Sequence, residues 1–168
     1  MTLSMYQASV PQFIRMLTNL TAILEKAAAH CEARKIDPLV LARYRLYPDM
    51  FNFARQVQAA CEHARNAAAR LSGAEAPRLD NPEQTFPELV GRVRDTIAYL
   101  TTFKPEQIDG SEDREVVVKR GETVSTYRGQ DYLVQRALPN FYFHVTTAYD
   151  ILRHKGVELG KPDYLGAY

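Results

Sequence analysis

The feature that most constrains this chain is a helical spacing of apolar residues, which recurs in four long segments. In the first segment the apolar positions alternate in steps of four and three, as on a helix with one buried face. They are Phe13, Leu17, Leu20, Leu24, Ala27 and Cys31. The second segment repeats the spacing and ends at Gly73, with apolar positions Phe53, Val57, Ala60, Ala64, Ala67 and Leu71. Because half of these are alanines, either a neighbouring helix approaches closely or a cavity remains.

The third and fourth segments carry clear signals at their ends. Thr85 and Glu88 form a T-x-x-E capping box at the start of the third. Its inward positions are Phe86, Val90, Val93, Ile97 and Leu100. Gly156 follows three basic residues and predicts the end of the fourth segment on capping and dipole grounds. The inward stripe of this last helix is Phe141, His144, Ala148 and Ile151.

The segments between these helices have other chemistry. Residues 35–50 contain two prolines and predict a connector with one short helical turn, and residues 74–84 predict a loop. Residues 115–127 (EVVVKRGETVSTY) have β-branched runs on either side of a glycine, which predicts a small hairpin.

The last part of the chain gives two further expectations. Residues 129–137 begin another helical stretch, and we expect Pro139 to break or kink it before the fourth long helix. We expect the final residues, 160–168, to form an extended tail.

Four amphipathic helices of about twenty residues predict an all-α four-helix bundle with a small β-hairpin between its third and fourth helices. The 168 residues suffice for a single domain over 1–168. The long link before the fourth helix leaves room for a crossover connection.

Composition excludes several classes of function. Twenty-one basic residues face twenty acidic ones, so no overall field attracts nucleic acid or an anionic membrane. No apolar run approaches the ~20 residues that a membrane span needs, and the N-terminus does not resemble a signal peptide. Cys31 and Cys61 form no CxxC motif and lie too far apart along their helices for a disulfide. We therefore expect a cytoplasmic protein that binds neither membrane nor nucleic acid.

Two of the four histidines are poor candidates for a site. His144 and His154 are about 15 Å apart along one helix, whereas two ligands of one metal lie about 3 Å apart. They cannot share an ion. His154 at the helix end and His30 beside Cys31 are expected to cap helices or lie at the surface.

His63 and His144 remain, because both lie near the middle of their helices and point inward. Metal sites in bundles use inward side chains from facing helices. The alternative is a pair of histidines at the core edge, satisfied by tyrosine, threonine or backbone partners. Cys61 and His63 point about 200° apart around their helix and cannot form a catalytic dyad. No familiar catalytic motif is present, so the catalytic residues are left unassigned.

Three stretches together resemble one family: SMYQASVPQFIRMLTNLTAILEKA, YPDMFNFARQVQAACEHARNAAARLSG and ALPNFYFHVTTAYDILRHKGVELGKPDYLG. It is a bacterial and fungal domain-of-unknown-function family within the DinB/YfiT-like superfamily of four-helix bundles. The resemblance implies an up-down-down-up topology and a homodimer. Characterised members of the superfamily hold nickel or zinc with three histidines, one from the second helix and two spaced H-x-x-x-H on the last. Some are thiol-dependent transferases or isomerases.

Carried over to this chain, the resemblance makes His63 the ligand from the second helix and His144 the first of the H-x-x-x-H pair. The second of that pair falls on Ala148, which offers no ligand atom. Asp49, Tyr149 or a water are the conceivable substitutes. Two hypotheses follow. The chain is either a bundle that binds a small ligand at an incomplete, vestigial metal site, or a divalent-metal-dependent thiol transferase or hydrolase acting on a small electrophile.

Overall fold

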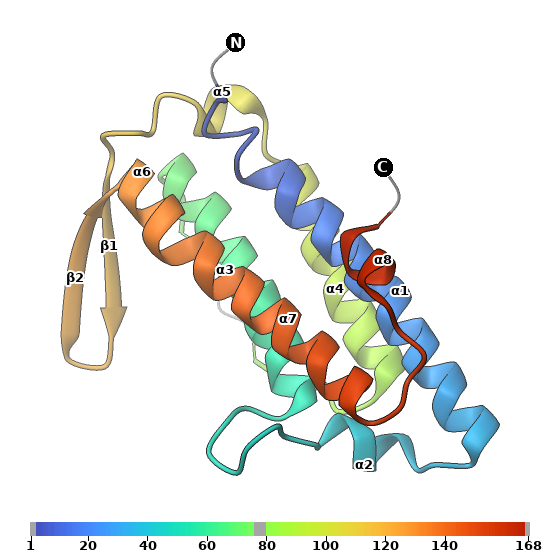
Figure 1. Ribbon diagram of the computed structural model, residues 1–168. Helices are drawn as coiled ribbons and strands as arrows, with labels where there is room; N and C mark the ends of the chain where they lie inside the picture. The colour runs from blue at the N-terminus through green and yellow to red at the C-terminus, as the bar shows by residue number, and fades with distance from the viewer. Residues whose placement is uncertain (1–2, 76–79, 167–168) are drawn as a thin grey trace.

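Four long helices lie side by side in the computed structural model, which describes residues 3–75 and 80–166 (Figure 1). They are α1 (Val10–Arg34), α3 (Phe53–Ser72), α4 (Phe86–Thr101) and α7 (Leu138–His154). The shorter elements are α2 (Pro38–Ala42), α5 (Pro105–Ile108), β1 (Glu115–Arg120), β2 (Thr123–Arg128), α6 (Gly129–Tyr132), the π-helical turn η1 (Leu133–Ala137) and α8 (Lys161–Leu165). The expected helical fold with one small sheet is confirmed.

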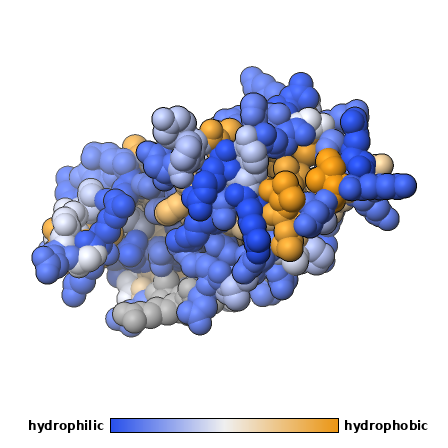
Figure 2. All heavy atoms as spheres, turned by 90° about the horizontal axis from the view of Figure 1, so that it is seen from below, coloured by the Kyte–Doolittle hydropathy of each residue, from blue (hydrophilic) through white to orange (hydrophobic). Residues whose placement is uncertain are grey.

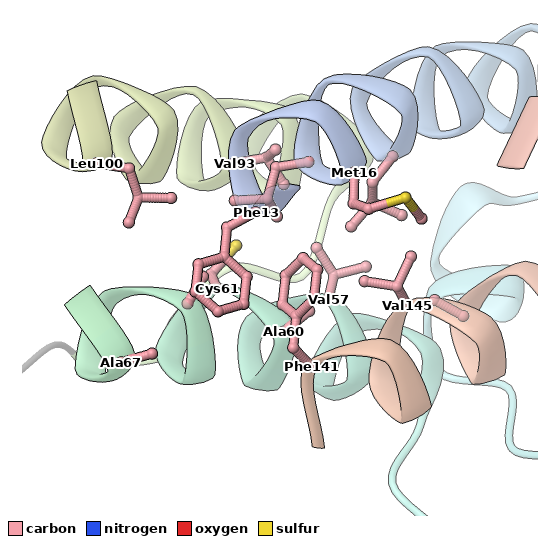
Figure 3. Packing of buried hydrophobic residues seen from close by; sticks show 14 of the residues in the cluster. Phe13, Met16, Val57, Ala60, Cys61, Ala67, Val93, Leu100, Phe141 and Val145 are labelled. Atoms are coloured by element: carbon pink, nitrogen blue, oxygen red, sulfur yellow. The ribbon is translucent and has the colours of Figure 1, made fainter. Parts of the chain in front are cut away.

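The core lies between the four long helices, where side chains from all of them meet (Figure 3). The main pairs in contact are α1 with α4, α3 with α7, and α3 with α4. Phe13 of α1 and Phe141 of α7 are fully buried and pack edge to face, with ring centroids 4.8 Å apart. The three alanines of the predicted apolar face of α3, Ala60, Ala64 and Ala67, are fully buried as well, so these small side chains allow the neighbouring helices to approach closely.

The β-hairpin also forms where the sequence predicts it. β1 and β2 pair antiparallel, with Arg120 opposite Thr123, so the turn is Gly121-Glu122. Gly121 has φ 57°, a left-handed value that glycine adopts at no steric cost.

Of the break or kink expected at Pro139, the break is wrong, because α6, η1 and α7 follow one another without interruption. Pro139 lies in the first turn of α7, directly after the π-helical turn. An α-helix would leave the carbonyl four residues before a proline without a donor. In a π-helical turn each carbonyl instead accepts from the N–H five residues further along the chain. The carbonyl four residues before a proline can therefore accept from the residue that follows the proline.

The expected extended tail is also wrong, since residues 161–165 form helix α8. The backbone N–H of Gly160 donates to the Asp163 carboxylate at 2.7 Å, which caps the first turn. Asn19 on α1 donates to the backbone carbonyl of Tyr164 at 2.9 Å and fixes α8 against the bundle. A five-residue helix has little helical periodicity, which is why spacing alone did not reveal it. Residues 167–168 lie outside the described part of the chain, as do residues 76–79 of the predicted loop.

The capping box at the start of α4 gives a direct test of local stability. Thr85 Oγ1 accepts from the Glu88 N–H, and the Glu88 carboxylate accepts from the Thr85 N–H at 2.9 Å. Thr85→Ala should lower the free energy of unfolding by about 1 kcal/mol, because one orphan N–H of the helix loses its partner. Urea unfolding measures this. Thr101→Ala, at the exposed end of the same helix, is the control and should change the value by less than about 0.5 kcal/mol.

The surface near α2 carries exposed apolar side chains, visible as the orange region in Figure 2. Val40 on α2 is 62% exposed, and Ile36 just before it is also exposed. Within the described ranges, no helix combines the length and the apolar character needed to cross a membrane.

Candidate functional site

His63 and His144 meet between α3 and α7, near the middle of each helix. Their ring centroids are 5.2 Å apart and their planes are inclined by 16°. His144 is only 8% exposed, and His63 is half-buried. The structure therefore brings together the two histidines that their inward positions singled out. Their role as metal ligands stays a prediction.

Gln56 fixes how His144 presents its ring. The His144 Nδ1 atom lies 2.7 Å from Gln56 Oε1, and Gln56 Nε2 donates to the backbone carbonyl of Phe51 at 3.2 Å. Since the amide nitrogen is the donor toward Phe51, the amide oxygen must accept, which places the proton on Nδ1. The lone pair of His144 then lies on Nε2. A buried partner that selects the tautomer in this way is a common feature of histidines that bind or exchange protons.

Both imidazoles are held in their neutral forms. Burial, as the largest cause, and the neighbouring His144, Arg136 and Arg70 together lower the pKa of His63 to about 4, against an opposing effect of Glu62. The pKa of His144 is also lowered, first by burial and then by Arg55, again against Glu62. A neutral imidazole keeps a free lone pair, so at neutral pH each ring can accept a hydrogen bond or coordinate a cation.

Two exposed aromatic side chains flank the pair on the His144 side. Phe51 lies nearly parallel to the His144 ring, with centroids 6.1 Å apart, and Phe143 meets its edge at 5.4 Å. The two phenylalanines are 46% and 56% exposed. Phenylalanine is seldom so exposed when it serves only the core, and here the two rings offer an apolar surface beside a polar pair.

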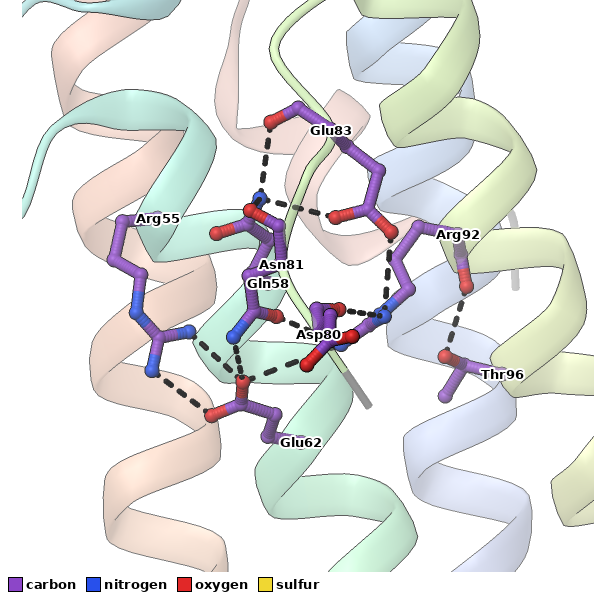
Figure 4. A network of polar contacts seen from close by, with 8 residues as sticks. All are labelled: Arg55, Gln58, Glu62, Asp80, Asn81, Glu83, Arg92 and Thr96. Carbon is purple, nitrogen blue, oxygen red and sulfur yellow. Dashed lines mark hydrogen bonds and ion pairs between the residues drawn. The ribbon is translucent and has the colours of Figure 1, made fainter. Parts of the chain in front are cut away.

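A network of polar contacts borders the site on α3 (Figure 4). Glu62, next to His63 in the sequence, forms two hydrogen bonds of 3.0 Å with Arg55 and accepts one from Asn81 at 2.8 Å. Arg92 of α4 reaches the same segment and forms an ion pair with Glu83 at 3.2 Å. The network fixes residues 80–83 against α3 and compensates the charge of Glu62. The Glu62 carboxylate is therefore already bonded to Arg55 and Asn81.

The donor set does not fit a three-histidine metal centre. Ala148, where the third histidine would stand, is a fully buried methyl group. Of the two conceivable protein substitutes, Asp49 is exposed in the loop before α3, and Tyr149 packs against Tyr164 with ring centroids 5.9 Å apart. In the described part of the chain, no group of three or more histidine, cysteine, aspartate or glutamate residues is placed to hold an ion. Of the residues that the sequence singled out as metal ligands or their substitutes, only His63 and His144 therefore lie together.

The other candidate groups lie elsewhere, as the helical spacing predicts. His154 is exposed at the end of α7, where Tyr44 faces it at 6.3 Å between ring centroids. His30 lies within α1, which runs on to Arg34, so it does not close that helix. Cys31 and Cys61 are buried and unbridged. Burial raises the pKa of Cys61 to about 11, which removes it as a thiolate nucleophile.

Three residues around the pair were not found from the sequence. Gln56 precedes His63 by two helical turns on the same face, so a polar residue at that position was a usable signal. Arg70 lies two turns after His63 on the same helix. Arg136 lies in the π-helical turn, and its closeness to His63 depends on how that turn continues into α7, which no pattern in the sequence reveals.

Comparison with known proteins finds a family and a solved structure that match nearly the whole chain. The family model described as Domain of unknown function (DUF1993) matches residues 5–165. A crystal structure described as that of a DinB family member protein from Shewanella denitrificans is 42% identical to this chain. The match covers 97% of this chain and 92% of that one, with a TM-score of 0.88. No sequence among the curated proteins matches this chain.

Proposed function

Because the chain belongs to the DUF1993 family and resembles a DinB family structure over nearly its whole length, we propose that it is a DinB/YfiT-like bundle that binds a small ligand at His63 and His144. The observation that carries this proposal is the pair of neutral imidazoles 5.2 Å apart, one of them oriented by a buried glutamine. A single DinB/YfiT-like domain over residues 1–168 with up-down-down-up topology is part of the proposal. The family match over 5–165 supports it, as does Figure 1, where α1 and α7 run opposite to α3 and α4.

The chemistry of the site suits a ligand with both a polar and an apolar part. Each neutral ring can accept a hydrogen bond, and His144 Nε2 is the nitrogen that Gln56 leaves free. Phe51 and Phe143 offer apolar faces next to the His144 ring. Pockets that combine a few oriented polar groups with aromatic walls are the usual form of small-molecule sites.

One observation favours a second candidate, a divalent-metal-dependent transferase or hydrolase. Two imidazoles that bind one zinc ion through nitrogens at about 2.1 Å have ring centres roughly 5 Å apart, close to the separation found here. With Ala148 in the third position, an ion would have only two protein ligands. We therefore expect weak binding of zinc or nickel, with no resident metal.

Metal analysis and ligand screening distinguish the two candidates. Protein purified without chelator should retain less than about a tenth of an equivalent of zinc or nickel, and calorimetric titration should give a Kd weaker than about 10 μM. The NMR signals of the His63 and His144 rings should shift on addition of small ligands, and His144→Leu should abolish this binding. Tight metal uptake, together with a metal-dependent transfer or hydrolysis that is lost in His63→Ala and His144→Ala, would support the metal-dependent enzyme instead. A screen in which no small molecule shifts either ring would contradict ligand binding at this site.

A homodimer is also proposed, with the apolar surface near α2 as support. Sedimentation equilibrium gives the mass directly, and a monomer at 100 μM, a concentration on the order of that used for structural work, would contradict it. A cytoplasmic location stays a prediction.

A further inference from the structure

Among the residues that the structure describes, two arginines beside the histidine pair have no carboxylate partner. Arg70 lies on α3, two turns beyond His63, and Arg136 lies in η1. The ion pairs formed by the described residues involve other basic groups, and neither of these two guanidinium groups has an acidic side chain within 4.0 Å. Arg55 and Arg92, at the other side of His63, are by contrast paired with Glu62 and Glu83.

The two unpaired arginines are held in place by tyrosines. Arg70 Nη1 donates to the Tyr132 hydroxyl at 3.0 Å, and Arg136 Nη1 donates to the Tyr127 hydroxyl at 3.1 Å. The two tyrosine rings lie next to each other, with centroids 6.2 Å apart. Each guanidinium also lies over the ring of its tyrosine, at 5.6 and 5.7 Å from the centroids. The two cations are therefore fixed in one cluster that includes residues of α3, β2, α6 and η1.

This cluster is rich in donors and poor in acceptors. Each tyrosine oxygen accepts from an arginine, and in the described residues neither hydroxyl proton has an acceptor. Arg70, Arg136 and Tyr127 are half-buried, so solvent and small solutes can reach them. Two like charges held together cost free energy, and an anion that enters the cluster offsets this cost.

The cluster and the histidine pair are close enough to act on one ligand. Arg70 lies two helical turns beyond His63 on α3, and Arg136 lies about two turns before His144 in the turn that continues into α7, so each arginine stands roughly 11 Å along the helix from one histidine of the pair. Because α3 and α7 are in contact and run antiparallel (Figure 1), both arginines lie at the same end of the pair. His63 is neutral and Arg55 is paired with Glu62, so the uncompensated positive charge beside the pair comes from Arg70 and Arg136. Arginine binds carboxylates and phosphates through two parallel N–H donors, and such charge-assisted bonds are stronger than neutral ones.

We infer that the ligand of the histidine pair carries an oxyanion group, a carboxylate or a phosphate, which Arg70 and Arg136 bind. This inference rests on the proposed function and adds the chemical class of the ligand. The tyrosine hydroxyls supply further donors to the same group, while Phe51 and Phe143 lie toward the other end of the pair.

The test uses two probes of the same shape and different charge. Benzoate and benzamide are titrated into the full-length protein at constant ionic strength, with inorganic phosphate in a third series, while NMR follows the His63 and His144 ring signals. Benzoate should bind at least about tenfold more tightly than benzamide, because only the carboxylate offers charge to the two arginines. Inorganic phosphate should compete with benzoate if the cluster accepts any oxyanion, and should fail to compete if it selects carboxylates.

Substitutions of the two arginines test whether the cluster contributes to the affinity for benzoate. Arg70→Gln and Arg136→Gln should each weaken benzoate binding at least about tenfold, because each removes one charge and one planar pair of donors. Arg70→Lys keeps the charge and should lose less affinity than Arg70→Gln, which separates charge loss from misfolding. Arg153→Gln is the matched control, since Arg153 is exposed at the far end of α7, and should change affinity less than about twofold.

The outcomes separate this inference from the proposed function. Equal binding of benzoate and benzamide, with the histidine signals shifting, would overturn the oxyanion inference and leave the ligand site in place. Benzoate binding that depends on the arginines but leaves both histidine signals unmoved would support oxyanion binding by the cluster and contradict the proposed function. If neither benzoate nor phosphate binds, or if Arg153→Gln weakens binding as much as Arg70→Gln, the inference is wrong.

Discussion

Phe141→Ala should lower the free energy of unfolding by about 3–5 kcal/mol, the largest effect that we expect from a single substitution in this chain. Phe141 is fully buried on α7 and packs edge to face on Phe13 of α1 at 4.8 Å, so it joins two of the four long helices (Figure 3). Alanine would remove the apolar contact area and leave a cavity that the surrounding helices can fill only in part. Chemical unfolding followed by circular dichroism gives the value.

Phe143→Ala supplies the matched control, because it is the same replacement two residues further along the same helix. Phe143 is 56% exposed and contributes little to the core. We expect its loss to cost less than about 1 kcal/mol. Equal costs for the two variants would show that the helix α7 is rotated relative to the packing described here, which would also move His144 away from His63.

Acid should weaken the fold by an amount that depends on His63. The pKa of His63 is lowered to about 4 in the native state from an ordinary value of 6.5. Below pH 6.5 the unfolded chain takes up a proton at this residue and the native state does not, so stability falls as the pH decreases toward 4. Above pH 6.5 the ring is neutral in both states and this contribution is fully present. The difference of 2.5 pKa units corresponds to a loss of about 3 kcal/mol between pH 6.5 and 4.

His63→Leu should flatten this dependence, since leucine cannot take up a proton. Free energies of unfolding are measured from pH 7.5 to 4 for the wild type and for the variant. The difference between the two curves isolates His63 from the carboxylates, which titrate in both proteins. A slope remains from His144, whose pKa is lowered as well. A pH dependence as steep in His63→Leu as in the wild type would rule out the assignment.

The site is only partly readable from the sequence. His144 could be placed inward because it lies on an apolar stripe, and His63 because it flanks one. In a helix of known period, the position of a residue in the sequence gives the direction of its side chain. Gln56 could have been placed beside His144 by the same reasoning, because it lies two turns before His63 on the same face of the helix. Arg136 could not, because its place next to His63 requires the π-helical turn before α7 and the packing of α7 on α3.

What the sequence determined by itself is local: the four amphipathic helices, the capping box at Thr85, the glycine at the end of α3 and the hairpin. Each follows from interactions between residues a few positions apart in the sequence, and these interactions do not depend on how the helices pack. The tertiary structure decided that α8 forms, because a helix of five residues is stable only against a partner surface such as α1. It also decided that Arg70 and Arg136 belong to one cluster, through the adjacent rings of Tyr132 and Tyr127. Their positions depend on contacts between α3 and a turn more than 60 residues later, and no periodicity links residues at that separation.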